Sequence, residues 1–299
     1  MFSDLTTEGR NPNSEKIDSF SALEIVDLMN SEDAKVAEAV GREKETIARA
    51  IDVIAARFRR GGRLVYIGAG TSGRLGILDA AECPPTFNTS PEQVVGLIAG
   101  GSSAMFRAVE GAEDSPTVPI DDLKAIQLSE NDALVGIATS GRTPYVLGGL
   151  DYARSIGAYA IGLSCNPDAA LADRADLTIA PIVGPEVISG STRLKAGTAT
   201  KMVLNMLTTG TMILLGKTYG NLMVDLRATN TKLLDRACRI VITFTELPQA
   251  EAEALLARCG GELKTAIATH LCKISPDEAR KRLAENGGQL RLALGPHAK

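Results

Sequence analysis

Short, continuously apolar runs recur along the middle of the chain, and each ends in glycine or small polar residues. Runs of this kind are typical of strands covered on both faces, whereas strands with one wet face alternate apolar and polar positions. Segments with helical spacing lie between the runs. The runs are RLVYIGAG from Arg63, VVGLIAGG from Val94, ALVGIATSG from Ala133, AYAIGLSC from Ala158 and LTIAPIVG from Leu177, and the helical segments are Gly73–Ala81, Ser103–Glu110 and Pro144–Ile156.

This alternation predicts an α/β fold with a doubly wound, parallel, five-stranded sheet. In such sheets ligands bind beyond the carboxyl ends of the strands. The loops after Ile67, Ala138 and Val183, which follow predicted strands, are therefore the candidate ligand-binding loops.

Helical patterns flank the predicted sheet on both sides. Ser21 and Glu24 form a capping box, which predicts a helix that runs through Leu28. A long amphipathic stretch follows from Glu32 to Phe58, and the pair Gly61-Gly62 ends it. After the sheet, further helical patterns span Thr192–Lys217 and Asp225–Thr243.

The end of the chain contains an internal repeat. EAEALLARCGGELKTAI begins at Glu251 and EARKRLAENGGQLRLAL begins at Glu278, with the pairs Gly260-Gly261 and Gly287-Gly288 in equivalent places. Each copy predicts a helix, a glycine turn and a second helix, so the tail is a small all-helical module. The predicted domains are an N-terminal helical segment (1–60), the α/β domain (61–220) and a helical C-terminal region (221–299).

Composition narrows the class of protein. The chain has 299 residues, 44% of them hydrophobic and 23% charged, with a net charge of −4, which indicates a soluble globular protein with no nucleic-acid partner. The polar start lacks a secretory signal, and the apolar run Met202–Leu215 is too short and too polar to span a membrane. Five scattered cysteines without a CxxC pair, and only two histidines, argue against disulfides and zinc. We expect a cytoplasmic protein without a metal or cofactor.

Three loops at predicted strand ends share one chemistry. GAGTSGR (Gly68–Arg74), TSGRTP (Thr139–Pro144) and the start of EVISGSTRLKAGTATK (Glu186–Lys201) each place glycines and hydroxyls before a helix. Free backbone N–H groups at a helix start and close-approaching glycines bind anions such as phosphate. The first loop matches GxGxxG, but the acidic residue of the dinucleotide fingerprint is missing. The predicted phosphate-binding residues are Gly70, Thr71, Ser72, Ser140, Gly141, Thr143, Ser189 and Ser191.

Longer strings carry a family resemblance. GAGTSGRLG with ATSGRTPY resembles the paired loops of sugar isomerase (SIS) domains, which bind phosphosugars. GAGTSGRLGILDAAECPPTF, GLIAGG, VEGAEDS, SCNP and GPEVISGSTRLKAGTATKMVLNM resemble the N-acetylmuramic acid 6-phosphate etherases, and the match covers nearly the whole chain. The glucokinase regulatory protein is similar in its SIS domains but is a longer, duplicated chain. The resemblance implies a ubiquitin-associated-like tail and a homodimer in which both subunits can contribute to a site.

The resemblance also implies a reaction: removal of a D-lactyl ether from carbon 3 of a phosphorylated amino sugar, in amino-sugar catabolism and the recycling of cell-wall 1,6-anhydro sugars. One group must take a proton and another must give one, and carboxylic acids suit both tasks. By the resemblance, Glu82 is the proton donor and Glu113 the base or water activator. Pro84-Pro85 predict that the helix ends near Glu82, and Glu113 follows Gly111 in a connection.

Several alternatives stay open at the level of sequence. Glu110 and Asp114 are neighbours that composition alone does not exclude as catalytic groups. The lactyl carboxylate needs a cationic or N–H partner, for which Arg74, Arg142, Arg193 and Lys195 are unranked candidates. Two other functions fit the loops: a phosphosugar aldose–ketose isomerase and a non-catalytic regulator that senses a phosphosugar. A SIS-containing transcription factor is disfavoured because no basic helix-turn-helix segment precedes the sheet.

Overall fold

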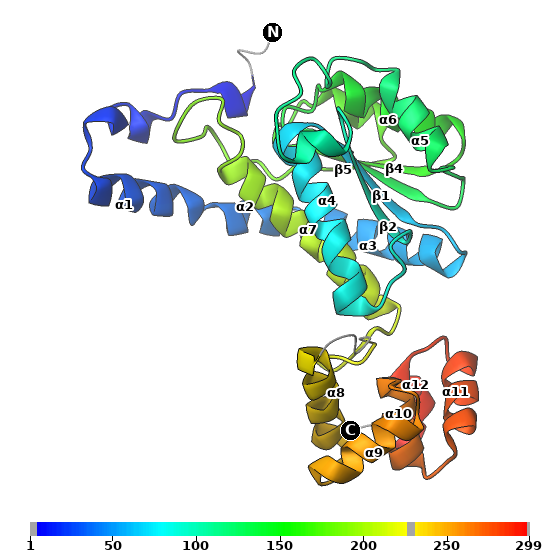
Figure 1. Cartoon of the computed structure of the whole chain (residues 1–299). Helices are drawn as coiled ribbons and strands as arrows, with labels where there is room; N and C mark the ends of the chain where they lie inside the picture. The colour runs from blue at the N-terminus through cyan, green and yellow to red at the C-terminus, as the bar shows by residue number, and fades with distance from the viewer. Residues whose placement is uncertain (1–4, 226–230, 298–299) are drawn as a thin grey trace. The chain divides into compact units, whose positions relative to one another are not determined.

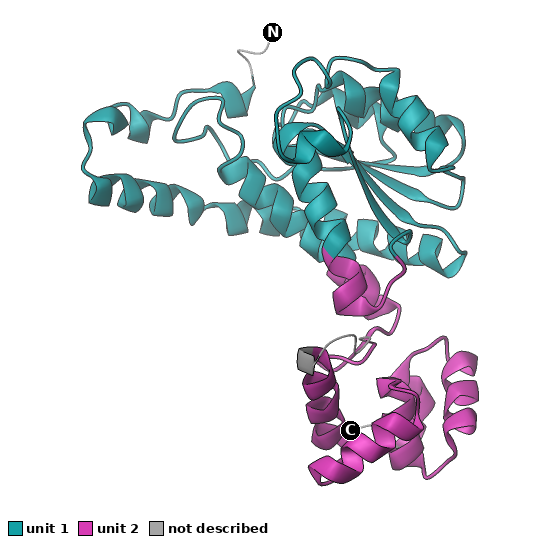
Figure 2. Cartoon of the chain, in the orientation of Figure 1, with its two compact units in different colours: residues 1–81, 91–208 teal, residues 82–90, 209–299 magenta. Residues whose placement is uncertain are grey.

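The computed structural model describes residues 5–225 and 231–297. It divides into two compact units, Met1–Ala81 with Pro91–Thr208, and Glu82–Ser90 with Thr209–Lys299 (Figure 2). Two long helices, α4 (Gly70–Phe87) and α7 (Lys195–Leu214), contribute residues to both units. The three-part division made from the sequence stays a prediction.

The first unit contains the predicted sheet (Figure 1). Its five strands are parallel in the order β2-β1-β3-β4-β5, which confirms the doubly wound topology. Leu64 of β1 pairs with Val94 on one side and with Ala133 on the other, so β1 and β3 run side by side. The strands are β1 (Leu64–Gly68), β2 (Val94–Ile98), β3 (Ala133–Ile137), β4 (Tyr159–Leu163) and β5 (Leu177–Ile179).

Helices α5 (Val118–Ala125) and α6 (Pro144–Ser155) cover one face of the sheet. Glycine at position 149 lets α6 approach β1 closely. A Cβ added at Gly149 would lie only 2.2 Å from Cδ1 of Ile67. Large apolar side chains fill the space between these layers. They include Val65, Ile67, Leu123, Leu134, Val146 and Leu150, all fully buried.

Helices α3 (Lys44–Arg59), α4 and α7 lie on the other face (Figure 1). A buried polar cluster joins β1, α4 and α7 there. Asp79 accepts hydrogen bonds from Oη of Tyr66 (2.9 Å), Nδ2 of Asn205 (2.7 Å) and Oγ1 of Thr208 (3.2 Å). Burial raises the pKa of Asp79, while these three hydrogen bonds act against that rise. The cluster fixes the two helices to the central strand.

The N-terminal helices differ in part from the prediction. The capping box of Ser21 and Glu24 is confirmed, and α1 spans Ala22–Asp33, one turn beyond Leu28. The stretch Glu32–Phe58 is divided between the end of α1, α2 (Val36–Arg42) and α3. Gly41, a weak helix former, precedes the break between α2 and α3. Short 3₁₀ turns at Thr6–Glu8, Pro12–Ser14 and Ile17–Ser19 come before α1.

Two local predictions around the site were wrong. The helix predicted over Ser103–Glu110 is only a 3₁₀ turn, Ser102–Met105, because Arg74 takes the carbonyl oxygens of Ala104 and Met105 that an α-helix would use. The helix predicted to end at Pro84-Pro85 continues to Phe87.

Packing explains why α4 tolerates its prolines. Each proline removes one helical N–H bond. The side chains of Cys83 and Phe87 are buried, and the N–H of Asn88 donates to the carbonyl of Pro84 at 3.0 Å, which completes the last turn. Glu82 therefore lies on a regular helix and not in a loop.

The second unit has its own apolar core. A short antiparallel pair, β6 (Thr218–Tyr219) and β7 (Leu222–Met223), comes first. Of the helix predicted over Asp225–Thr243, residues 226–230 lie outside the described residues, and α8 spans Thr231–Thr245. No helix in the described ranges has the length and apolar character that a membrane span requires. The remaining helices are α9 (Gln249–Arg258), α10 (Leu263–Cys272), α11 (Pro276–Glu285) and α12 (Leu290–Leu294).

The predicted repeat is confirmed as two helix pairs. Gly260-Gly261 join α9 to α10, and Gly287-Gly288 join α11 to α12. All four glycines have positive φ, between 61° and 78°. Side chains other than glycine rarely adopt this conformation, so the aligned glycine pairs of the sequence reflect one repeated turn.

Replacing Asp79 by alanine tests the cluster beneath β1. The change removes the carboxylate that accepts from Tyr66, Asn205 and Thr208, and we expect unfolding to become easier by about 3 kcal/mol. Asp79→Asn, which keeps one acceptor oxygen, should lose less. Urea denaturation of the three proteins measures both effects; equal stability of wild type and Asp79→Ala would contradict the assigned role.

Candidate functional site

The first two predicted phosphate loops meet beyond the carboxyl ends of β1 and β3. Ser72 Oγ, in the first turn of α4, lies 3.5 Å from Thr139 Oγ1, in the loop after β3. Connections leave β1 and β3 in opposite directions along the sheet, and ligands of doubly wound proteins bind at such a switch point. The fold therefore brings Gly70, Thr71 and Ser72 close to the loop that holds Ser140, Gly141 and Thr143.

The second loop is held in a tight turn that only glycine accommodates. Gly141 has a φ of +69°, and its N–H donates to the carbonyl of Ala138 at 2.8 Å. Ser140 Oγ accepts from the N–H of Arg142 at 3.2 Å, and Thr143 stands at the N-cap position of α6. The turn presents hydroxyl and amide groups at the start of a helix, which suits a phosphate.

Asn166, at the exit of β4, braces this loop and was not predicted from the sequence. Its Nδ2 donates to the carbonyl of Thr139 at 2.8 Å and to Oγ1 of Thr7 at 3.1 Å. The N–H of Cys165 donates to the same Thr139 carbonyl at 3.0 Å. The available signal was its place in the loop after a buried strand, three residues beyond Leu163, because ligands of such sheets bind at the loops that follow the strands.

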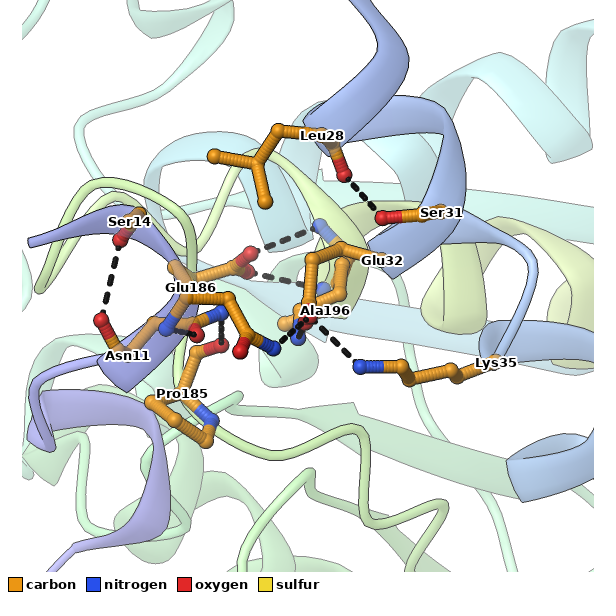
Figure 3. Close-up of polar contacts among 11 residues, drawn as sticks. Asn11, Ser14, Leu28, Ser31, Glu32, Lys35, Pro185, Glu186 and Ala196 are labelled. Atoms are coloured by element: carbon orange, nitrogen blue, oxygen red, sulfur yellow. Dashed lines mark hydrogen bonds and ion pairs between the residues drawn. The ribbon is translucent and has the colours of Figure 1, made fainter. Parts of the chain in front are cut away.

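The third loop is organised differently from the first two. Glu186, fully buried, accepts from the backbone N–H groups of Lys195 and Ala196, both at 3.0 Å (Figure 3). The protein's own carboxylate thus occupies the first turn of α7, where a bound anion would otherwise sit. Burial raises the pKa of Glu186, although the two N–H donors oppose that rise.

Of the two serines of the third loop, Ser189 contacts the N-terminal segment and Ser191 bonds within the loop. Ser189 Oγ donates to the carbonyls of Glu8 (2.9 Å) and Gly9 (3.3 Å). The N–H of Ser191 donates to the carbonyl of Ile188 at 3.0 Å. Their part in phosphate binding stays a prediction.

A cavity of about 320 Å³ lies beside the first loop. Arg74 spans it from α4, with Nε 3.1 Å from the carbonyl of Met105 and Nη2 2.8 Å from that of Ala104. The carbonyl of Glu113 accepts from the N–H of Tyr145 at 3.0 Å, which fixes the Glu113 turn to the start of α6. The residues that line the cavity are Ala69, Gly70, Arg74, Ala99, Ala104, Ala108, Val109, Glu110, Gly111, Ala112 and Glu113.

The two predicted catalytic glutamates have different settings. Glu113 lies in a turn, as expected, and lines the cavity next to Gly70. Glu82 lies on α4, three turns after Gly70, and is not among the lining residues. Both side chains are exposed in the single chain. The cavity itself brings together two carboxylates, those of Glu110 and Glu113, with the guanidinium of Arg74 and the first glycine loop.

Sequence comparison assigns the domains. Residues 46–154 match the N-terminal SIS domain of the glucokinase regulatory protein, and residues 120–210 match the SIS domain in general. Residues 220–264 match the C-terminal lid domain of the glucokinase regulatory protein. The expected SIS-like α/β fold is thereby confirmed.

Relatives over almost the full length decide the family. An N-acetylmuramic acid 6-phosphate etherase of Rhodopirellula baltica is 63% identical over 93% of this chain and 92% of its own length. A protein of the same name from Clostridium beijerinckii is 57% identical over the same shares. The chain belongs to the N-acetylmuramic acid 6-phosphate etherase family. The resemblance carried by the loop motifs is thus confirmed.

Solved structures place the etherase family in a wider fold group. A phosphoheptose isomerase from Neisseria gonorrhoeae is 17% identical, with a TM-score of 0.50 over 64% of this chain and 98% of its own. The likeness shows a shared fold.

Replacing Gly141 by alanine tests the second loop. A Cβ there would lie 2.2 Å from Cβ of Ala169, in a backbone conformation that alanine avoids. We expect a loss of at least about 1 kcal/mol in stability and weaker binding of N-acetylglucosamine 6-phosphate. Calorimetric titration measures the affinity.

Gly41→Ala is the matched control, because a Cβ at Gly41 meets nothing within 4 Å. It should leave the affinity unchanged. Native affinity in Gly141→Ala would show that this turn does not hold the phosphate.

Proposed function

We propose that the chain is a carbon–oxygen lyase that cleaves the D-lactyl ether of N-acetylmuramic acid 6-phosphate, giving N-acetylglucosamine 6-phosphate and D-lactate. The observation that carries this proposal is the 63% identity to an etherase over 93% of the chain, combined with Glu113 in the cavity beside the glycine loop that begins α4. The reaction belongs to amino-sugar catabolism and the recycling of cell-wall 1,6-anhydro sugars.

The two loops at the β1–β3 switch point bind the phosphate monoester. Ser72, Ser140 and Thr143 supply hydroxyl donors, and the first turns of α4 and α6 supply N–H groups. Neutral donors in fixed positions hold a dianion without the rearrangement that a flexible cation requires.

Elimination followed by hydration accounts for the products. With the sugar open as its aldehyde, Glu113 takes the proton from carbon 2, and the electron pair forms a double bond conjugated with the aldehyde. The bond from carbon 3 to the ether oxygen breaks, and Glu82 gives that oxygen a proton, so lactate leaves with an alcohol group. Water then adds at carbon 3, its proton goes to a carboxylate, and carbon 2 regains a proton. No electrons are gained or lost overall.

Arg74 is the cation best placed for the lactyl carboxylate. It lines the cavity that contains Glu113, and its planar fork suits a carboxylate. Lys195, a second candidate from the sequence, is 2% exposed and is paired with Glu32, so it does not reach a substrate. Arg142 lines a different cavity, with Pro167 and Asp168.

A homodimer completes the site in this proposal. Acid–base chemistry on an ether needs a pocket from which water is largely excluded, whereas Glu82 and Glu113 are both exposed in a single chain. Glu82 also does not line the cavity that contains Glu113. A second copy that brings its own Glu82 to the cavity resolves both points.

Glu82→Gln and Glu113→Gln test the acid–base pair. Each variant should lose at least about a hundredfold in kcat while still binding N-acetylglucosamine 6-phosphate, because only proton transfer is removed. Release of lactate from N-acetylmuramic acid 6-phosphate measures turnover and separates the etherase from an aldose–ketose isomerase or a regulator.

Glu110→Gln is the matched control, since Glu110 lines the same cavity without an assigned role. Its turnover should stay close to native. Mixing the Glu82→Gln and Glu113→Gln proteins should restore part of the activity if each site combines glutamates from two copies. Full turnover in either single variant would refute the assigned pair.

Arg74→Lys tests recognition of the lactyl group. Lysine keeps the charge but loses the bidentate fork, so KM for the lactyl substrate should rise by roughly tenfold or more. Affinity for N-acetylglucosamine 6-phosphate, which has no carboxylate, should stay unchanged. An equal loss for both ligands would mean that Arg74 acts only by holding the Ala104–Met105 turn.

A further inference from the structure

A buried ion pair lies at the start of α7, away from the cavity. Lys195 Nζ is 2.6 Å from Glu32 Oε2, and the two side chains are 2% and 4% exposed. Glu32 also accepts from Nδ2 of Asn13 (2.9 Å) and from Lys35 Nζ (2.5 Å), the second of which Figure 3 shows. In the described part of the chain, the donors to the Glu32 carboxylate thus come from the N-terminal helical segment and from α7.

The Glu32 carboxylate of this pair stays ionised at neutral pH. Burial alone would raise the pKa of Glu32, but the hydrogen bonds from Lys195, Lys35 and Asn13 outweigh burial and lower it to about 2. Apolar side chains of similar size are often as stabilising as a buried ion pair. Stability alone therefore does not explain why charged residues occupy these two positions. A buried pair does fix geometry, because each partner must meet the other.

Two carboxylates together hold the first turn of α7. Glu186 binds the backbone N–H groups of Lys195 and Ala196, while Glu32 binds the side chain of Lys195 (Figure 3). Backbone and side chain of one residue are therefore anchored from two separate segments, the third loop and α1. The turn has little freedom to rotate or slide.

This first turn lies beside the first phosphate loop and is linked to the second through Cys165. A Cβ added at Gly197 would lie 3.7 Å from Cγ2 of Thr71, in the first loop. Cys165 Sγ lies 3.9 Å from the carbonyl of Ala196, and the N–H of Cys165 donates to the carbonyl of Thr139, in the second loop. A displacement of the turn that begins at Lys195 therefore moves the backbone next to Thr71, and through Cys165 it reaches the carbonyl of Thr139.

We propose that Glu32, Lys195 and Glu186 form a positioning cluster that sets the separation of the two phosphate loops and so determines affinity for the phosphosugar. None of the three touches substrate. This inference rests on the proposed phosphosugar-binding function and adds to it a structural element outside the cavity.

The test separates geometry from stability. Lys195→Met leaves Glu32 buried without its main partner and should lower the thermal midpoint. In the double variant Glu32→Met with Lys195→Met, the unpaired charge is gone, so much of the lost stability should return. Its dissociation constant for N-acetylglucosamine 6-phosphate should nevertheless rise roughly tenfold, with a matching rise in KM and little change in kcat. Glu32→Gln, which keeps the side-chain size, supplies the same measurement if the double variant does not fold.

Arg63→Met is the matched control. Arg63 pairs with Asp132 at 2.8 Å, and the two residues precede β1 and β3, at the opposite ends of these strands from the phosphate loops. Asp132 is 2% exposed, so this variant also leaves a buried carboxylate without its cation. We expect a lower thermal midpoint with native affinity for the phosphosugar.

Two outcomes would overturn the inference. Native affinity in a folded double variant, or in Glu32→Gln, means that the cluster contributes to stability alone. Absence of phosphosugar binding by the native chain rejects the proposed function and the positioning role together. Weaker binding in the double variant, with native binding in Arg63→Met, supports the inference.

Discussion

The close parallel pairing of β1 and β3 is the constraint on which the site depends. Because Leu64 pairs with Ala133 and Gly68 with Ile137, the two strands end level with each other. Their exit loops must then lie side by side, and Ser72 and Thr139 come within 3.5 Å. The helices that follow, α4 and α6, begin at this edge and direct their positive ends toward it.

The features that the sequence predicted correctly are those encoded by neighbouring residues. A buried parallel strand needs an unbroken apolar run, and each of the five runs became a strand. Glycine pairs predicted the turns of the tail, since Gly260 and Gly287 adopt the positive φ that such turns need. The glycine and hydroxyl spacing of the first two loops is local as well, and the two loops do meet beyond β1 and β3, while their binding of phosphate stays a prediction.

Contacts between distant residues account for what the sequence did not predict. The helix expected over Ser103–Glu110 fails because Arg74, thirty residues away, binds its carbonyls. Pro84 and Pro85 did not end α4, since burial of Cys83 and Phe87 outweighs two lost hydrogen bonds. The Glu32–Lys195 pair joins residues 163 apart, and no spacing rule connects them.

Some carboxylates of the chain are buried and others are exposed, and this difference affects the chemistry that each can perform. Buried carboxylates such as Glu32, Glu186 and Asp79 each accept several hydrogen bonds, which fixes their positions and leaves them no part in proton transfer. Glu82 and Glu113 are exposed, and a carboxylate in water is a weak acid catalyst at neutral pH. In the proposed mechanism, burial of these two groups comes from the substrate and a second copy of the chain. On this view a rigid scaffold of paired charges determines where the phosphate binds, and assembly determines when the glutamates become effective acids and bases.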